Sequence, residues 1–440
     1  MKRRQFAVPL PFNLPLPGAK RRLDPNLRVV WLIPFLALLA LYVVYRVILV
    51  ESYINYQLVV LVALAYTLTV TFAIFGRFAL AFRYNTTQFD DVTYEPSVTV
   101  LIPVKNEEKV IASTVRSVLS SYYPSDKLDV IVINDGSSDG TQLELEALKT
   151  ATTRLTIERF PKNKGKRAAL EFGFTHARGE IVVVVDSDTV VRPNCIMEIV
   201  KPLSDPAVAG VSGHTDVSDP QSALEKMQAA SYFASYLLFK KAEATLGIVT
   251  CLPGCASAYR KSAVLRFLNQ WRYQTFMGTP CTVGEDRGLT TFLLRDGWRT
   301  VYVPTAVTET RVPAKLRTLI RQRVRWKRSF FRESILQSEF MHERWGALYF
   351  YPYILTSLIA PFLAVVILLL APFLFGPVVL GLYVGGIALV SVVYSVYSKI
   401  YRPRFSAVWL ACWSVFNLLV LNLLSIYAAI TITDGKWGTR

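Results

Sequence analysis

The stretch EIVVVVDSDT, residues 180–189, determines how the rest of the chain is interpreted. A run of β-branched valines predicts a buried strand, and Asp186 and Asp188 follow it directly. Carboxylate oxygens suit Mg²⁺ or Mn²⁺, and a metal ion held there would neutralise a departing diphosphate. A polar turn that caps the next helix explains the two aspartates equally well.

Short β-rich runs alternate with helical ones on both sides of this stretch. This alternation predicts an α/β domain with a doubly wound, mostly parallel sheet. Neither a GxGxxG nor a Walker sequence follows the first strand, which disfavours a Rossmann dehydrogenase and a P-loop NTPase. The expected strands are 97–104, 128–135, 155–160, 180–188 and 208–214, and the expected helices are 107–121, 141–150, 164–177 and 193–203.

Polar residues gather where these strands end, and ligands of such sheets bind at the carboxyl ends of the strands. In NDGSSDGT (134–141), Asp135 would accept hydrogen bonds from a nucleobase or a ribose, although a glycine-rich turn explains the stretch equally well. In KNKGKRAAL (162–170), Lys166 and Arg167 begin a helix, where backbone N–H groups favour phosphate. A solvated basic loop is the alternative.

The stretch GEDRGLT, residues 284–290, opens another helix. Glu285 and Asp286 would favour its positive end. In the functional interpretation one of them is a general base, because a sugar hydroxyl must lose its proton as it attacks an anomeric carbon. The local sequence does not separate these two interpretations.

Composition indicates a membrane protein with anionic partners. Hydrophobic residues make up 52% of the 440 residues and the net charge is +17, a combination that points away from a soluble nucleic-acid binder. Basic residues before the first expected span and after the second place the N-terminus and the residues after 77 in the cytoplasm. The expected spans are 29–50, 57–76, 349–371 and 377–398, and 405–432 is a further apolar block.

The five cysteines lie mostly in the cytoplasmic part, where thiols stay reduced, so a disulfide framework is not expected. Cys251 and Cys255 have no second pair and no nearby histidine, which favours pocket-lining thiols over a zinc site.

A basic amphipathic helix is predicted from Pro313 to about Phe340. Nine Lys or Arg occur between 311 and 332, and an interfacial helix ahead of a span explains this charge. It does not explain Q-x-x-R-W, in which Gln322 and Arg325 lie on one side of the helix. Its expected apolar face comprises Leu316, Leu319, Ile320, Val324, Phe331 and Ile335.

Taken in order, D-G-S-S-D, D-x-D, the E-D pair and Q-x-x-R-W resemble the processive, membrane-embedded family-2 glycosyltransferases with a GT-A fold, over most of the chain. YQTFMGTP (273–280), WKRSFFRES (326–334) and the terminal WGTR (437–440) look like hyaluronan synthases. GCASAYRKSA (254–263) and LRDGWRTVYVPTA (294–306) look as much like nodulation-type chitin-oligosaccharide synthases. Hyaluronan synthases carry S-G-P where this chain has Pro253, Gly254 and Cys255.

This resemblance implies a role for each candidate residue. Asp286, beside Glu285, would be the catalytic base, and Asp188 would coordinate Mg²⁺ or Mn²⁺ beside Asp186. The donor UDP would lie against Asp135, Lys166, Arg167, Asp186 and Arg325. Gln322, Arg325 and Trp326, together with Cys251, would line the path of the acceptor into a transmembrane channel, and Trp437 and Arg440 would close over the substrate.

The implied organisation has six parts in a multi-pass protein of the cell membrane. They are a basic segment (1–28), two spans (29–83), a cytoplasmic GT-A domain (84–310), interfacial helices (311–347), a C-terminal membrane region (348–432) and the WGTR segment (433–440). Five straight spans would leave WGTR outside the cell, so residues 405–432 are predicted to form a re-entrant or kinked hairpin that returns the C-terminus to the cytoplasm.

The expected activity is hyaluronan synthesis from UDP-GlcNAc and UDP-GlcA, with export of the growing polysaccharide through the protein's own membrane spans. Membrane lipid is an expected partner, and nucleic acid is not. A synthase that uses UDP-GlcNAc alone, making chitin oligomers or poly-N-acetylglucosamine, is the alternative. A membrane scaffold or receptor with a decayed transferase domain is a third interpretation, against which the intact set of acidic residues argues.

Overall fold

The computed structural model describes residues 57–85, 87–344, 346–375, 378–402 and 405–435. The predicted span 29–50 lies outside these residues. The domain between the long helices is built on an eight-stranded sheet. Its strand order is β3-β2-β1-β4-β7-β6-β10-β5. Its strands are β1 (Val98–Val104), β2 (Leu128–Asn134), β3 (Leu155–Arg159), β4 (Ile181–Val184), β5 (Thr189–Val191), β6 (Val208–Val217), β7 (Ser257–Arg260) and β10 (Arg299–Thr310).

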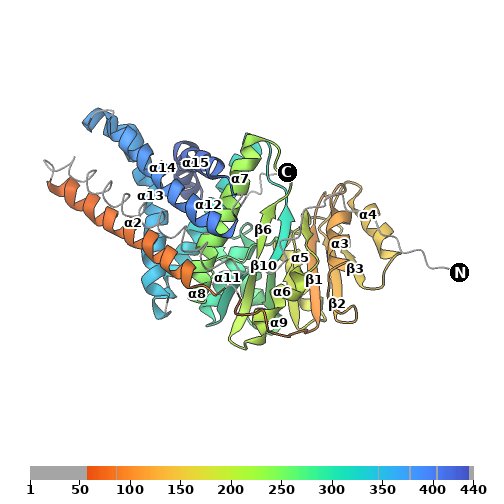
Figure 1. The fold of residues 1–440 in the computed structure, drawn as a ribbon. Coiled ribbons are helices and arrows are strands. Elements are labelled where there is room, and N and C mark those ends of the chain that lie inside the picture. Colours follow the sequence, from red (N-terminus) through yellow and green to blue (C-terminus); the bar gives the residue numbers. More distant parts are fainter. Residues whose placement is uncertain (1–56, 86, 345, 376–377, 403–404, 436–440) are drawn as a thin grey trace.

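Helices cover both faces of the sheet (Figure 1). Every residue of β1 is buried, which is why this strand is apolar throughout. Val100 and Ile102 face the cluster that contains α3 (Ile111–Leu119), whereas Leu101 faces the cluster that contains α5 (Lys166–His176). Side chains on a strand alternate between faces, so one apolar run fills two cores. The remaining covering helices include α4 (Thr141–Lys149), α6 (Cys195–Val200), α9 (Lys261–Leu265), α10 (Leu268–Arg272) and α11 (Glu285–Arg295).

The sheet is mixed, which corrects the prediction of a mostly parallel one. Strands β3, β2, β1 and β4 are parallel, but β7 is antiparallel to both β4 and β6, and β5 is antiparallel to β10. The sequence did not predict β5 and β7 because they have only 3 and 4 residues. Strand β10 contains Pro304 and an irregular register between Tyr302 and Val307, which breaks the pattern of a regular strand.

The basic helix forms as α12 (Leu316–Ser338), three residues later than predicted. Gln228 donates a hydrogen bond of 2.9 Å to the carbonyl of Pro313, which ties this residue to α7 (Ala223–Ala234) ahead of the helix. The expected apolar face is only partly right. Leu319, Val324 and Phe331 are buried, but Leu316 and Ile335 are 46% and 43% exposed, while Arg328 and Arg332 are buried.

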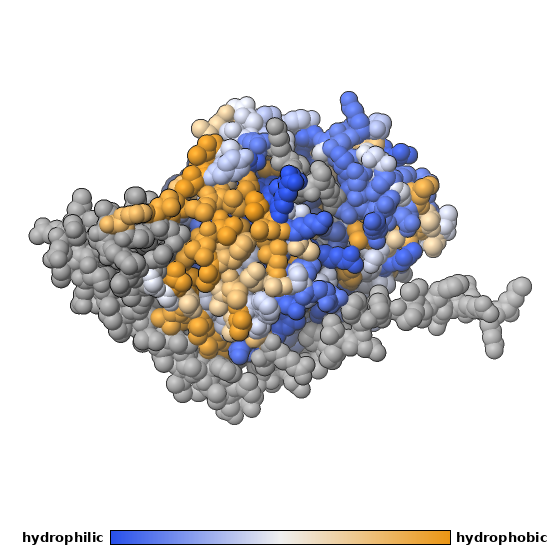
Figure 2. Space-filling view, turned by 90° about the horizontal axis from the view of Figure 1, so that it is seen from above, coloured by the Kyte–Doolittle hydropathy of each residue, from blue (hydrophilic) through white to orange (hydrophobic). Residues whose placement is uncertain are grey.

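Four long helical segments pack at one end of the domain (Figure 1). Helices α2 (Gln57–Arg83), α13 (Ala347–Phe375) and α14 (Val378–Tyr401) share an apolar cluster with η2 (Ser235–Lys240) and α8 (Lys241–Thr245). The segment of α15 (Ala407–Phe416), η4 (Asn417–Leu421) and α16 (Leu423–Ile430) follows. Figure 2 shows hydrophobic residues gathered on one side of the molecule and hydrophilic residues on the other.

Among the described residues, one helix is long and apolar enough to cross a membrane, Val384–Tyr401 within α14. A second exists if Ala407–Leu421 and Leu423–Ile430, which meet at a bend of 47°, count as one span. The predicted bundle of spans therefore remains a proposal.

Candidate active site

Lys166 forms ion pairs with two acidic residues from different motifs, Asp186 of D-x-D and Glu285 of the E-D pair. Its Nζ lies 2.6 Å from Oδ1 of Asp186 and 2.7 Å from Oε1 of Glu285. Lys166 is the first residue of α5, Asp186 follows β4, and Glu285 is the first residue of α11. Burial disfavours the charge of Lys166, but the two carboxylates outweigh it and hold the pKa of Lys166 well above its usual value.

The neighbouring carboxylates Glu285 and Asp286 have opposite proton affinities. Burial opposes ionisation of Glu285, yet the ammonium of Lys166 lowers the pKa of Glu285 to about 2. Burial raises the pKa of Asp286, and the negative charge of Glu285 raises it further. Asp286 Oδ2 lies 3.8 Å from Sγ of Cys251. Asp286 is therefore the carboxylate of this pair that accepts a proton more readily.

Lys166, Glu285 and Asp286 line one pocket. Its walls are Lys166, Leu170, Val184, Gly254, Ser257, Tyr259, Glu285, Asp286 and Leu289. Gly254 is required there, because a Cβ at this position would lie 2.7 Å from Oδ1 of Asp186. Cys255 places its Sγ 3.5 Å from the other oxygen of Asp186. The residues that stand in place of S-G-P thus form the wall beside the D-x-D motif.

Asp186 and Asp188 are the two carboxylates that would hold a divalent cation. Burial, followed by the charge of Asp186, raises the pKa of Asp188 to about 6, against the effect of Lys166 and Arg325. This excess of negative charge is what a bound cation would relieve. Among the described residues, no group of three His, Cys, Asp or Glu could hold a metal. The two carboxylates fit Mg²⁺ or Mn²⁺ when diphosphate oxygens supply further ligands.

Asp135 and Arg167 are used within the protein. The carboxylate of Asp135 accepts hydrogen bonds from the backbone N–H groups of Lys164 (2.7 Å) and Gly165 (2.9 Å), which shapes the turn before Lys166. Arg167 is 3% exposed and donates to the carbonyl of Trp271 and, at 3.0 Å, to Gln274. Contacts of Asp135 and Arg167 with UDP remain predictions.

Helix α12 brings the Q-x-x-R-W residues to the same region. Arg325 lowers the pKa of both Asp188 and Glu285, so it contributes positive charge to the acidic centre. The ring centroid of Trp326 lies 6.3 Å from that of Tyr232 in α7, and Oε1 of Gln322 is buried without a hydrogen-bond partner among the described residues. The charges of Asp186 and Asp188 contribute to the raised pKa of Tyr232, so this residue lies near the D-x-D motif. The sequence did not predict Tyr232 because it belongs to no motif.

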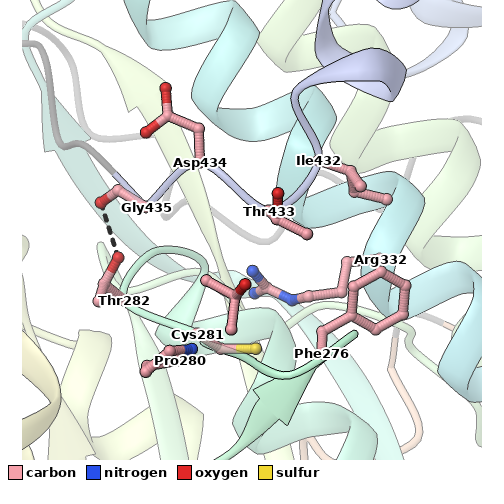
Figure 3. Close-up of a pocket in the computed structure, with 10 residues that line it drawn as sticks. Phe276, Pro280, Cys281, Thr282, Arg332, Ile432, Thr433, Asp434 and Gly435 are labelled. Carbon is pink, nitrogen blue, oxygen red and sulfur yellow. Dashed lines mark hydrogen bonds between the residues drawn. The ribbon is translucent and has the colours of Figure 1, made fainter.

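The C-terminal segment docks onto the domain beside α12 (Figure 3). Arg328 Nη2 lies 3.1 Å from Oδ2 of Asp434, and Thr282 Oγ1 donates to the carbonyl of Gly435 at 2.6 Å. A pocket lies between them, lined by Phe276, Thr279, Pro280, Cys281, Thr282, Arg332, Ile432, Thr433, Asp434 and Gly435. Trp437 and Arg440 lie outside the described residues, and their gating role remains a prediction.

A family model described as glycosyltransferase like family 2 matches residues 96–329, which contain every acidic group of the pocket. The chain belongs to glycosyltransferase family 2. This transferase is 29% identical over 364 residues to an N-acetylglucosaminyltransferase of Azorhizobium caulinodans, covering 80% of this chain and 89% of that protein. It is also 29% identical over 378 residues to the hyaluronan synthase of Streptococcus pyogenes, covering 83% of this chain and 87% of that protein.

The fold of the transferase is that of a known glycosyltransferase structure. A mannosyltransferase from Pyrobaculum calidifontis, in complex with GDP-Man and Mn²⁺, superposes with a TM-score of 0.53 and 21% identity, covering 84% of this chain and 98% of that one. The GT-A-like fold predicted from the sequence is confirmed, with a curled mixed sheet in place of a mostly parallel one.

Proposed function

We propose that the transferase is a hyaluronan synthase that polymerises GlcNAc and GlcA from UDP-GlcNAc and UDP-GlcA and exports the product through its own membrane helices. The observation that supports this proposal is that Lys166, Glu285 and Asp286 line one pocket, where Lys166 also pairs with Asp186 of the D-x-D motif. The similarity to a hyaluronan synthase over 83% of the chain supports the choice of product.

In this reaction Asp286 removes the proton of an acceptor hydroxyl as that oxygen attacks the anomeric carbon of the donor. The new C–O bond forms on the face opposite the departing UDP, so the anomeric configuration inverts. Lys166 and Arg325 stabilise the charge that develops on the diphosphate. A divalent cation held by Asp186 and Asp188 would supply further charge neutralisation when bound. Glu285 keeps Lys166 in place through their ion pair.

Trp326 and Tyr232 would bind the acceptor, because their neighbouring rings suit the apolar face of a sugar. Trp326 is 38% exposed, which leaves its indole available to a bound chain. The path from Asp286 toward the long helices would pass Cys251, which lies 3.8 Å from that carboxylate.

Incubation of the purified protein with each UDP-sugar alone and with both tests the product. The proposal expects polymer only when UDP-GlcNAc and UDP-GlcA are both present, and digestion of that polymer by a hyaluronidase. Substantial polymer from UDP-GlcNAc alone would contradict it.

That outcome would favour a second candidate, a chitin-oligosaccharide or poly-N-acetylglucosamine synthase. The similarity to the Azorhizobium caulinodans enzyme, at the same 29% identity, supports this alternative. The sugar requirement of the purified protein separates the two candidates.

A further inference from the structure

Two cations on α12 lack a counter-charge among the described residues. Arg323 and Lys327 lie one helical turn apart. The Nε and Nη2 atoms of Arg323 are out of solvent contact and have no hydrogen-bond partner in the described part of the chain. Lys327 Nζ donates a hydrogen bond of 2.7 Å to the hydroxyl of Ser425. By contrast, Arg328 and Arg332 of the same helix pair with the carboxylates of Asp434 and Glu333.

The groups that surround the two cations are neutral. The guanidinium carbon of Arg323 lies 4.7 Å from the ring centroids of both Trp326 and Trp413. Cation–π contacts of this kind offset only part of the cost of removing a charge from water. Burial and the charge of Arg323 lower the pKa of Lys327 to about 8. Two adjacent, desolvated cations without a carboxylate form an electrostatic site for an anion.

This site is separate from the one that would hold the donor diphosphate. Arg325 acts electrostatically on Asp188 and Glu285, and Arg323 and Lys327 each lie two residues from it. At about 100° per residue, they point to the opposite side of α12. Their contacts agree, because Trp413 belongs to α15 and Ser425 to α16.

The outer side of the α15–α16 segment identifies the kind of anion. Its exposed side chains include Val408, Leu419, Leu423, Tyr427 and Ile430. Helices α2, α13 and α14 expose similar apolar groups, and Figure 2 shows the apolar side of the molecule bordered by hydrophilic residues. Arg323 contacts Trp326, which is 38% exposed. An anion held beside this exposed ring fits the phosphate of a membrane lipid whose acyl chains cover the apolar surface.

We propose that Arg323 and Lys327 bind the headgroup phosphate of an anionic phospholipid between α12 and the α15–α16 segment. This inference rests on the proposed membrane-embedded transferase. The bound lipid joins the C-terminal helices to the helix that carries Gln322, Arg325 and Trp326. Lipid binding thereby sets the position of α12 against the acidic pocket, and transfer depends on lipid composition.

The test uses the full chain in nanodiscs of phosphatidylcholine with increasing phosphatidylglycerol, and reads both the thermal unfolding midpoint and UDP release. We expect both to rise with phosphatidylglycerol in the wild type. The double variant Arg323→Gln/Lys327→Gln should need roughly tenfold more of this lipid for the same rise. The control Arg317→Gln/Arg321→Gln removes two exposed cations from the same helix and should respond like the wild type.

Equal shifts in both double variants would overturn the proposal, because they would indicate diffuse surface attraction. An equal rise of the unfolding midpoint on adding inorganic phosphate to phosphatidylcholine discs would also overturn it. The same rise on adding glucuronate oligosaccharides would contradict a lipid site as well. The midpoint still reports the lipid response if UDP release is absent under every condition. Failure of the proposed function is thus distinguishable from failure of the lipid site.

Discussion

Asp286 owes its suitability as a base to the residue before it. Glu285 is neutralised by Lys166 at 2.7 Å, whereas Asp286 is half-buried beside that carboxylate. Desolvation and the charge of Glu285 raise the pKa of Asp286. Replacing it by Asn keeps the shape and removes the proton acceptor. We expect Asp286→Asn to lower the rate of UDP release by about 10²-fold to 10⁴-fold, measured with both UDP-sugars.

A matched control is Asp91→Asn, which removes an exposed aspartate from the same domain. It should retain the wild-type rate. Equal loss in the two variants, or an unchanged rate in Asp286→Asn, would contradict the assignment of the base.

The pH dependence follows from the same pair. A base must be deprotonated, so kcat/KM should fall as pH drops through the pKa of Asp286, which lies above the usual aspartate value of about 3.9. Removing the charge of Glu285 lowers the pKa of Asp286, so Glu285→Gln should move this acidic limb to lower pH. A limb that stays in place or moves upward would show that the two carboxylates are not coupled.

At the scale of elements, a buried network ties α12 to the turn before Glu285. Arg332 donates a hydrogen bond of 2.6 Å to the carbonyl of Val283 and forms an ion pair of 2.9 Å with Glu333. Gln274 donates 3.3 Å to the same Glu333 oxygen. Glu333 is 0% exposed, so its loss would leave the charge of Arg332 buried and unpaired. Glu333→Gln should therefore destabilise the fold by about 3–5 kcal/mol.

Chemical denaturation of the purified protein checks this value. The control Glu339→Gln removes a carboxylate that is 60% exposed and pairs with Arg295, and should cost at most about 1 kcal/mol. A similarly small loss in Glu333→Gln would mean that water reaches Arg332 and that the network does not hold the turn.

The elements that the sequence predicted best are those with a single strong pattern. The strand before Asp186 and the helix after Gly284 form as expected because valine runs and helix-start residues act locally. Strands β5, β7 and β10 were missed because their pairing comes from distant parts of the chain. Arg167 shows the same limit within a site. It follows Lys166 in sequence, but packing against α10 gives it partners in Trp271 and Gln274.

At the scale of the whole molecule, both ends of the α15–α16 segment contact the transferase domain. Arg402, just before it, lies 3.4 Å from Asp216, and Phe405 stacks on Phe233 at 5.3 Å. At the other end Arg328 holds Asp434. A straight crossing would separate these ends by the membrane, so the contacts support the predicted return of the C-terminus to the cytoplasm.

Cysteine labelling in intact cells tests this topology. In a cysteine-free background, Ser406→Cys and Thr433→Cys should react with a membrane-impermeant maleimide only after permeabilisation. Labelling of one site but not the other in intact cells would show that residues 405–432 cross the membrane once. A cysteine replacing Asp91, in the catalytic domain, serves as the cytoplasmic reference.

The central claim is that acidic side chains from β4 and α11 form one centre for a nucleotide sugar and a divalent cation. A cryo-electron microscopy structure with UDP and Mn²⁺ tests it most directly. We expect the ion between the diphosphate and the carboxylates of Asp186 and Asp188, with Lys166 and Arg325 near the diphosphate and Asp286 facing the acceptor side. Density for UDP away from these residues, or an ion bound without either aspartate, would contradict it.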